Sequence, residues 1–169
     1  MIDKILKTTI KETLENRSVS KVDWSGSPFL KTKLEGKNAV GDFGENLIKN
    51  LYESKGKKAK IIKKGHDVLA DNKKIEVKTA FQNKTKGFFF NQIYYEKYVK
   101  EELKDWDHLA FVFVSPFSIE VWECKRPTNP KKHFTRNNGW AWHKNSSSKL
   151  CQKTWKKTYT WSKEVTDEK

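Results

Sequence analysis

One stretch of this sequence, DVLADNKKIEVKT beginning at Asp67, combines two carboxylates and a lysine in a pattern that suits phosphodiester hydrolysis. It predicts a β-hairpin with its turn at Asp71 and Asn72, because Asp and Asn tolerate left-handed backbone angles. Side chains alternate along a strand, so Glu76 and Lys78 share one face, and Asp67 begins the partner strand. Two carboxylates beside an ammonium group are what a divalent-metal phosphodiesterase site needs.

The alternative is a solvated strand face with an ordinary ion pair, which chance can supply in a chain with 35 basic and 21 acidic residues. A segment upstream favours the chemical interpretation. Gly44 removes side-chain bulk beside Glu45, so a helix there can lie close to a sheet. Glu45 could then reach a metal ion held by the hairpin. Gly56 is placed to end this helix, whose apolar residues recur at helical spacing: Val40, Phe43, Leu47 and Leu51.

The order of these residues resembles the PD-(D/E)XK nuclease superfamily, which has the restriction-endonuclease-like fold, and most of all its small type II restriction endonucleases. On this resemblance Asp67 is the first-strand aspartate, Glu76 the acidic residue of the second strand and Lys78 the motif lysine. Glu45 matches the helix glutamate of many members, whereas His66 stands where the family often has proline. The resemblance implies catalysis by these four residues with Mg²⁺, or Mn²⁺ in its place, bound by Asp67, Glu76 and Glu45.

The rest of the chain predicts an α/β fold with a restriction-endonuclease-like core, in which a mixed central β-sheet is flanked by helices. Residues 91–103 are expected to form a helix whose aromatic residues, Tyr94, Tyr95 and Tyr98, pack on the sheet. Two more strands are expected from an apolar run and from alternation, at residues 108–114 and 119–124.

One nuclease domain is expected over residues 1–169, in three parts. Residues 1–38 hold an N-terminal helix and a loop, residues 39–124 the catalytic core, and residues 125–169 a basic, aromatic, β-rich extension. The N-terminal helix is predicted to be an amphipathic packing helix from its apolar residues Ile2, Ile5, Leu6, Ile10 and Leu14.

Basic residues interleaved with aromatic ones in the C-terminal third suit a groove that follows phosphates and contacts bases. Alternatively, at least half of the tryptophans there form the core of a small β-lobe. A basic stretch at residues 57–64 could bring a phosphate backbone toward Asp67, although a solvated edge strand is the usual form of such alternation. The residues expected to contact DNA are Lys63, Lys64, Lys84, Lys86, Asn91, Gln92, Arg136, Trp140 and Trp142.

The net charge of +14 on 169 residues favours a polyanionic partner, with nucleic acid first. The sequence has no apolar run long enough to span a bilayer and no signal-peptide pattern, so a cytoplasmic protein with free thiols and no membrane partner is expected. A zinc site remains a weak alternative, because the spacing lacks the close pairs of a zinc finger in its four candidate ligands, Cys124, His133, His143 and Cys151.

Two classes of function follow. The first is a Mg²⁺-dependent endonuclease acting on double-stranded DNA, of the restriction type or, among relatives, a junction-resolving or repair nuclease. The second is a non-catalytic nucleic-acid-binding protein on the same scaffold. The complete set of acidic residues and lysine favours the enzyme, and only the family resemblance favours DNA over RNA. An enzyme that cuts both strands usually acts as a two-fold dimer, so a homodimer is expected, with a monomer or one subunit of a two-protein nuclease as the alternatives.

Overall fold

A six-stranded mixed sheet forms the centre of the structure, a computed structural model that describes residues 22–62 and 64–163. The predicted N-terminal helix, with its apolar residues from Ile2 to Leu14, lies outside the described residues, and so does Lys63. Strands β3 and β7 are parallel, and the other neighbours are antiparallel. In spatial order the strands are β1 (Ala59–Ile61), β2 (Val68–Ala70), β3 (Lys73–Phe81), β7 (His108–Ser115), β8 (Ser118–Lys125) and β11 (Lys156–Ser162).

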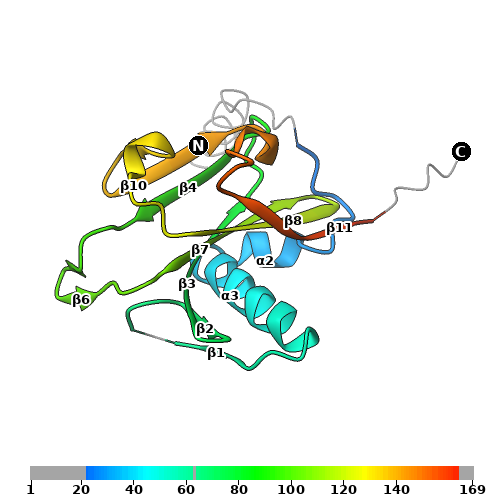
Figure 1. Ribbon diagram of the computed structural model, residues 1–169. Helices are drawn as coiled ribbons and strands as arrows, with labels where there is room; N and C mark the ends of the chain where they lie inside the picture. The colour runs from blue at the N-terminus through cyan, green and yellow to red at the C-terminus, as the bar shows by residue number, and fades with distance from the viewer. Residues whose placement is uncertain (1–21, 63, 164–169) are drawn as a thin grey trace, which may run out of the picture.

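The described helices cover one face of this sheet, and a second, smaller sheet covers the other (Figure 1). The helices are α2 (Leu30–Leu34) and α3 (Lys37–Ser54), and in the described part of the chain no helix is both long and apolar enough to cross a membrane. The smaller sheet contains β4 (Phe88–Ile93), β10 (Trp140–Lys144) and β9 (Thr135–Arg136). The predicted α/β fold with a mixed central sheet is confirmed, but the expected helices on the second face are replaced by strands.

The β2–β3 hairpin forms where the sequence predicts it. Asp71 and Asn72 adopt positive φ angles of 51° and 66°, so a two-residue turn joins Ala70 to Lys73. Such a turn matches the right-handed twist of the flanking strands. Along β3 the apolar side chains of Ile75 and Val77 belong to the core beneath α3. The polar side chains at the alternate positions of β3 must therefore point to the other face of the central sheet.

Two apolar cores hold the central sheet from its two faces. The core beneath the helices is mainly aliphatic and includes Ile48, Ile75 and Val112, all fully buried. The core beneath the smaller sheet is aromatic, and the Phe111 ring stacks on Phe90 at 4.0 Å and on Trp155 at 4.6 Å between ring centroids. Offset aromatic pairs add to the free energy gained by burial alone.

The predicted helix over residues 91–103 is wrong. Its first residues finish β4, which pairs with β10, and two short strands follow, β5 (Tyr98–Val99) and β6 (Glu102–Leu103). Lys100 and Glu101 adopt positive φ angles of 48° and 67°, which form a tight turn between these strands and are incompatible with a helix. Tyr98 is 59% exposed on this hairpin rather than packed on the sheet.

The C-terminal extension completes the layers already described. Strand β11 joins the central sheet beside β8, and two 3₁₀ turns, Pro130–Lys132 and Ser147–Lys149, flank β9 and β10. Trp142 and Trp155 are buried in the aromatic core, and Trp140 packs against it half-buried. The alternative that at least half of these tryptophans are core residues is therefore confirmed.

Helix α3 lies against β3 at the glycine that the sequence singled out. A Cβ atom at Gly44 would lie 1.8 Å from Thr79 Oγ1 and 3.3 Å from Val77 Cγ1, so only glycine permits this approach. A Cβ atom at Gly41, one turn earlier in the helix, would have no neighbour within 4 Å. The two glycines therefore have different structural roles, although both lie in α3.

We expect Gly44→Ala to lower the free energy of unfolding by about 1–3 kcal/mol, because the added methyl group forces α3 away from the sheet. Gly41→Ala should instead raise it by about 0.5–1 kcal/mol, since alanine favours a helix and meets nothing there. Urea unfolding of the two variants beside the wild type measures both changes. Equal effects of the two substitutions would contradict the close packing at Gly44.

Candidate active site

The candidate active site lies where β3 continues beyond the end of β2. The strands pair from Ala70 back to Val68, and the Asp67 N–H still donates to the Ile75 carbonyl at 3.0 Å. The next N–H of β3, that of Val77, donates instead to Asp67 Oδ2 at 2.7 Å. Asp67 thus ends the pairing of the two strands with its own carboxylate. Its side chain is fixed at the open edge of β3.

Glu76 and Lys78 lie side by side on the face of β3 away from the helices. Lys78 Nζ lies 2.8 Å from Glu76 Oε1, and the side chains are 22% and 3% exposed. The second oxygen, Glu76 Oε2, is buried and has no hydrogen-bond partner. A buried carboxylate oxygen without a partner is costly, so this atom is a natural position for a ligand that carries positive charge.

Helix α3 brings Glu45 to the same place, as the position of Gly44 predicted. Burial raises the pKa of Glu45 to about 7, and the nearby Asp67, Asp42 and Glu76 carboxylates contribute further. Glu45 also lines the same cleft as Asp67 and Lys78, so it lies close to the hairpin carboxylates. All four residues proposed from the sequence, Glu45, Asp67, Glu76 and Lys78, therefore gather at one site.

Charge crowding defines the electrostatics of this site. Burial, together with the negative charge of Glu76, raises the pKa of Asp67 to about 6, although Lys78 opposes the shift. Burial alone would lower the pKa of Lys78, but the Glu76 and Asp67 carboxylates outweigh it, so its pKa lies above the ordinary value. The site therefore holds a charged ammonium group and more carboxylate than that one cation can neutralise.

The site opens into a cleft of about 610 Å³ between α3 and β4. Asp67, Lys78 and Glu45 line it, together with Asn91 and Gln92, which the sequence predicted to contact DNA. The sequence interpretation missed further polar or aromatic lining residues, among them Lys33, Lys37, Asn83 and Phe89. Of these four, Phe89 carries a local signal, because a strand with one exposed face normally alternates, whereas residues 88–90 are all phenylalanine.

A second cavity, of about 460 Å³, lies on the other side of Asp67. Its lining includes the predicted Lys64 and two further lysines, Lys100 and Lys104. His66 also lines it, and its Nδ1 lies 2.9 Å from Asp105 Oδ1, while Lys74 binds the other oxygen of Asp105 at 2.6 Å. Lysines therefore lie on both sides of the Asp67 carboxylate.

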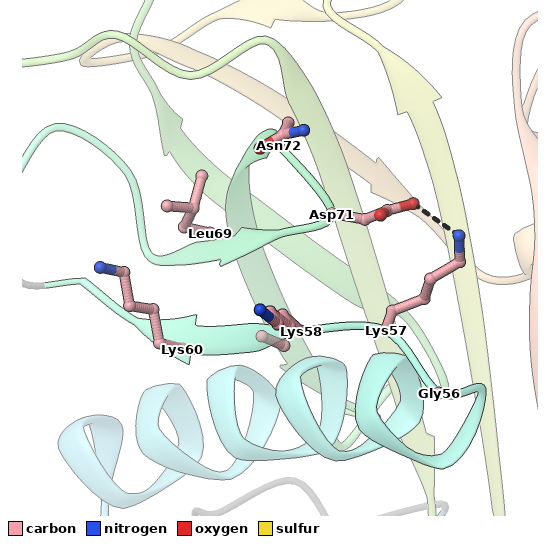
Figure 2. A pocket seen from close by; sticks show the side chains of 8 residues that line it. Gly56, Lys57, Lys58, Lys60, Leu69, Asp71 and Asn72 are labelled. Atoms are coloured by element: carbon pink, nitrogen blue, oxygen red, sulfur yellow. Dashed lines mark ion pairs between the residues drawn. The ribbon is translucent and has the colours of Figure 1, made fainter.

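Figure 2 shows a third hollow, of about 630 Å³, beside the edge strand β1. Lys57, Lys58 and Lys60 line it, and Asp71 reaches toward Lys57 with an ion pair of 2.9 Å. Residues 57–61 of the basic stretch thus form or adjoin the solvated edge strand that the sequence offered as the alternative, whereas Lys64 lines the cavity beside Asp67. This hollow lies at the turn of the β2–β3 hairpin, at the opposite end of β2 from Asp67, so it can attract phosphate but does not contain the reacting groups.

The other residues expected to contact DNA have different environments. Lys84 and Lys86 are exposed in the loop that contains Asn83, which lines the cleft. Arg136 is exposed and lies over the Trp140 ring at 5.3 Å. Trp142 is buried in the aromatic core, so the prediction that it contacts DNA is wrong, whereas Trp140 is half-buried and packs against that core.

The four candidate zinc ligands lie in separate environments. Cys124 is buried in the aromatic core, where burial raises the pKa of its thiol to about 12, whereas Cys151 is exposed. His143 packs edge-on against Phe89, and His133 lies beside Phe134. No three His, Cys, Asp or Glu side chains within residues 22–62 and 64–163 form a ready-made metal centre.

Mg²⁺ does not require such a centre. It usually binds one or two carboxylates and completes its shell with water and substrate phosphate. The hard oxygen donors of Asp67 and Glu76, with the unpartnered Oε2 atom of Glu76, fit this requirement, and Glu45 supplies a third carboxylate at the margin. These residues therefore fit a divalent cation, while softer metals would prefer sulfur or imidazole ligands.

Comparison of the chain with protein-family models, with curated proteins and with solved structures found no match. The functional interpretation therefore depends on the residues and the geometry described above.

Burial of Glu45, together with carboxylate crowding, predicts a pH-dependent gain in stability for Glu45→Gln. Because the folded state raises the pKa of Glu45, protonated Glu45 favours folding at low pH, and this stability is lost as the pH rises through about 7. In EDTA at pH 8, Glu45→Gln should therefore melt roughly 2–4 °C above the wild type, an effect of about 1 kcal/mol after allowance for solvent screening. At pH 4.5 the two proteins should melt together.

Thermal melts at both pH values measure this difference. The matched control is Glu53→Gln on the same helix, whose carboxylate is exposed and paired with Lys49 at 3.0 Å. A gain of the same size in the control, or no gain at pH 8 in Glu45→Gln, would contradict the crowding.

Proposed function

We propose that this protein is a Mg²⁺-dependent endonuclease of the restriction type, which hydrolyses phosphodiester bonds of double-stranded DNA. The observation that carries the proposal is the gathering of Asp67, Glu76 and Lys78 at the open edge of β3, with an unpartnered carboxylate oxygen on Glu76. In a chain of net charge +14, buried carboxylates within a cleft have no evident purpose for a protein that only binds an anion.

Asp67 and Glu76 would hold the metal ion, and Glu45 would add a ligand or orient one. When bound, the ion supplies Lewis-acid chemistry at the scissile phosphate and lowers the pKa of water. Lys78 keeps its proton because both carboxylates stabilise the ammonium group. Its Nζ atom therefore acts as a hydrogen-bond donor that orients the attacking water and stabilises negative charge growing on the phosphate oxygens.

The lysines around the site support a path for the phosphate backbone. Lys33 and Lys37 line the cleft on the helix side, and Lys64, Lys100 and Lys104 line the cavity on the far side of Asp67. A strand that passes over Asp67 would therefore meet positive charge before and after the scissile phosphate. Contacts of this kind supply affinity and make it dependent on salt, but they carry no sequence information.

The substitution Lys78→Ala tests whether this lysine contributes to catalysis and not to DNA binding. Its ammonium group is needed most in the transition state, so we expect its loss to slow cleavage by at least about two orders of magnitude while DNA affinity changes by only a few-fold. Asp67→Ala and Glu76→Ala should be equally inactive. Cleavage of supercoiled plasmid, of linear duplex and of a four-way junction in Mg²⁺, beside binding in Ca²⁺, measures both quantities and distinguishes the junction-resolving alternative.

Lys125→Ala, an exposed lysine at the end of β8, is the matched control and should cut at the wild-type rate. Near wild-type cleavage by Lys78→Ala would show that this hairpin is not the active site. Cleavage at full rate in excess EDTA would rule out the metal. Binding without cleavage by the wild type in both Mg²⁺ and Mn²⁺ would favour the non-catalytic alternative.

We propose a homodimer as the active form, because one site cuts one strand and a symmetric duplex site needs two. A dimer should convert supercoiled plasmid to linear product with little accumulation of the nicked circle. Sedimentation of the protein with and without DNA, combined with this assay, gives the assembly state. A monomer that only nicks would overturn the dimer and leave the nuclease proposal intact.

A further inference from the structure

Strand β4 has a β-bulge where it borders the cleft. Between two of the pairs that it forms with β10, its residues Asn91 and Gln92 stand opposite the single residue Ala141. Gln92 adopts a φ of 54°, a left-handed conformation that is unfavourable for a residue with a side chain. In a regular strand one of two successive side chains would point into the core. The bulge instead leaves both amides exposed, and both line the cleft.

Phe89 extends this polar pair with an apolar group. It lies two residues before Asn91, is 42% exposed and lines the same cleft. His143 of β10 packs edge-on against it, at 5.4 Å between ring centroids, and so supports the ring from the neighbouring strand (strands β4 and β10 in Figure 1). An aromatic ring held in an open position beside two carboxamides is a surface with the chemistry to recognise a nucleobase.

We infer that the β4–β10 ribbon reads an A·T base pair in the major groove of the DNA, next to the bond that is cut. This inference rests on the proposed function and specifies its substrate. Strand β4 is the edge of the three-stranded sheet β4–β10–β9, and strands of β-sheets can read the major groove. The carboxamide of Asn or Gln pairs with the N6 and N7 edge of adenine through two hydrogen bonds. A phenylalanine ring suits the thymine methyl group of the same pair.

The position of the ribbon fits this function. Asn91, Gln92 and Phe89 share their cleft with Asp67 and Lys78, so the base pair that they contact lies close to the scissile phosphate. Lys33 and Lys37 line that cleft too, from the segment that contains α2 and the start of α3. Phosphate contacts and base contacts therefore come from different elements, which is the usual division between positioning and sequence recognition.

The first experiment maps cleavage of a randomised duplex library by the full-length protein in Mg²⁺. We expect an A·T pair at a fixed distance from the cut. In Asn91→Ala, and in Gln92→Gly, which keeps the left-handed backbone, the preference for that pair should fall about 5- to 150-fold, the range for loss of a two-bond base contact. Asn145→Ala, an exposed amide outside the cleft, is the matched control and should keep the preference.

The second experiment changes the DNA instead of the protein. N6-methylation of the adenine should slow wild-type cleavage through loss of the amide contacts, and replacement of thymine by uracil should slow it through loss of the methyl group. Phe89→Ala should become indifferent to uracil but remain sensitive to N6-methylation, whereas Asn91→Ala should show the reverse. Tyr98→Ala, which removes an aromatic ring of similar exposure on the β5–β6 hairpin, should behave as wild type.

Melting curves confirm that each variant is folded. Cleavage by the wild type with no A·T preference, or a preference that survives in Asn91→Ala and Gln92→Gly, would overturn this inference and leave the nuclease proposal standing. A wild-type protein that neither binds nor cuts any duplex would overturn the proposed function and this inference with it.

Discussion

The hydrogen bond of 2.7 Å from the Val77 N–H to Asp67 Oδ2 is the contact on which the candidate site depends. It replaces the next backbone pair of the β2–β3 ladder with a side chain, so the strands separate while β3 continues along β7. The carboxylate is thereby fixed in the gap where the strands diverge. Glu45 on one face of the sheet and Lys78 on the other can reach this gap, because no other described strand pairs with this edge of β3.

Much of this arrangement could be predicted from the sequence, because it follows from local rules. The left-handed turn at Asp71 and Asn72, the alternation along β3 and the glycine before Glu45 each act within a few residues. The remainder depends on pairing between distant segments. Asn91 and Gln92 look like the start of a helix in isolation, and only their pairing with β10 makes them a bulged strand. Lys33 and Lys37 reach the cleft through the packing of α2 and α3, which no local pattern encodes.

The site is electrostatically unbalanced in a way that suits a substrate and a cation together. Lys78 is paired with Glu76, and burial together with the neighbouring carboxylates raises the pKa values of Glu45 and Asp67. A divalent cation would relieve this repulsion, and the phosphate would then be attracted by the cation and the surrounding lysines. Neither ligand alone neutralises the whole site. Metal and DNA should therefore bind more tightly together than separately, since each reduces the electrostatic cost of the other.

Rigidity on both faces of β3 explains how such crowding is maintained. On one face of β3, Ile75 and Val77 belong to the aliphatic core beneath α3. On the other face, which carries Lys78, Ala80 belongs to the aromatic core. Glu76 and Lys78 therefore stand on a strand that is packed from both sides, and the close approach at Gly44 keeps Glu45 of α3 against it. Stacked rings such as Phe90 and Phe111 also tie β4 to the central sheet. The same aromatic packing thus supports the wall of the cleft that carries the β4 bulge, opposite the charged groups.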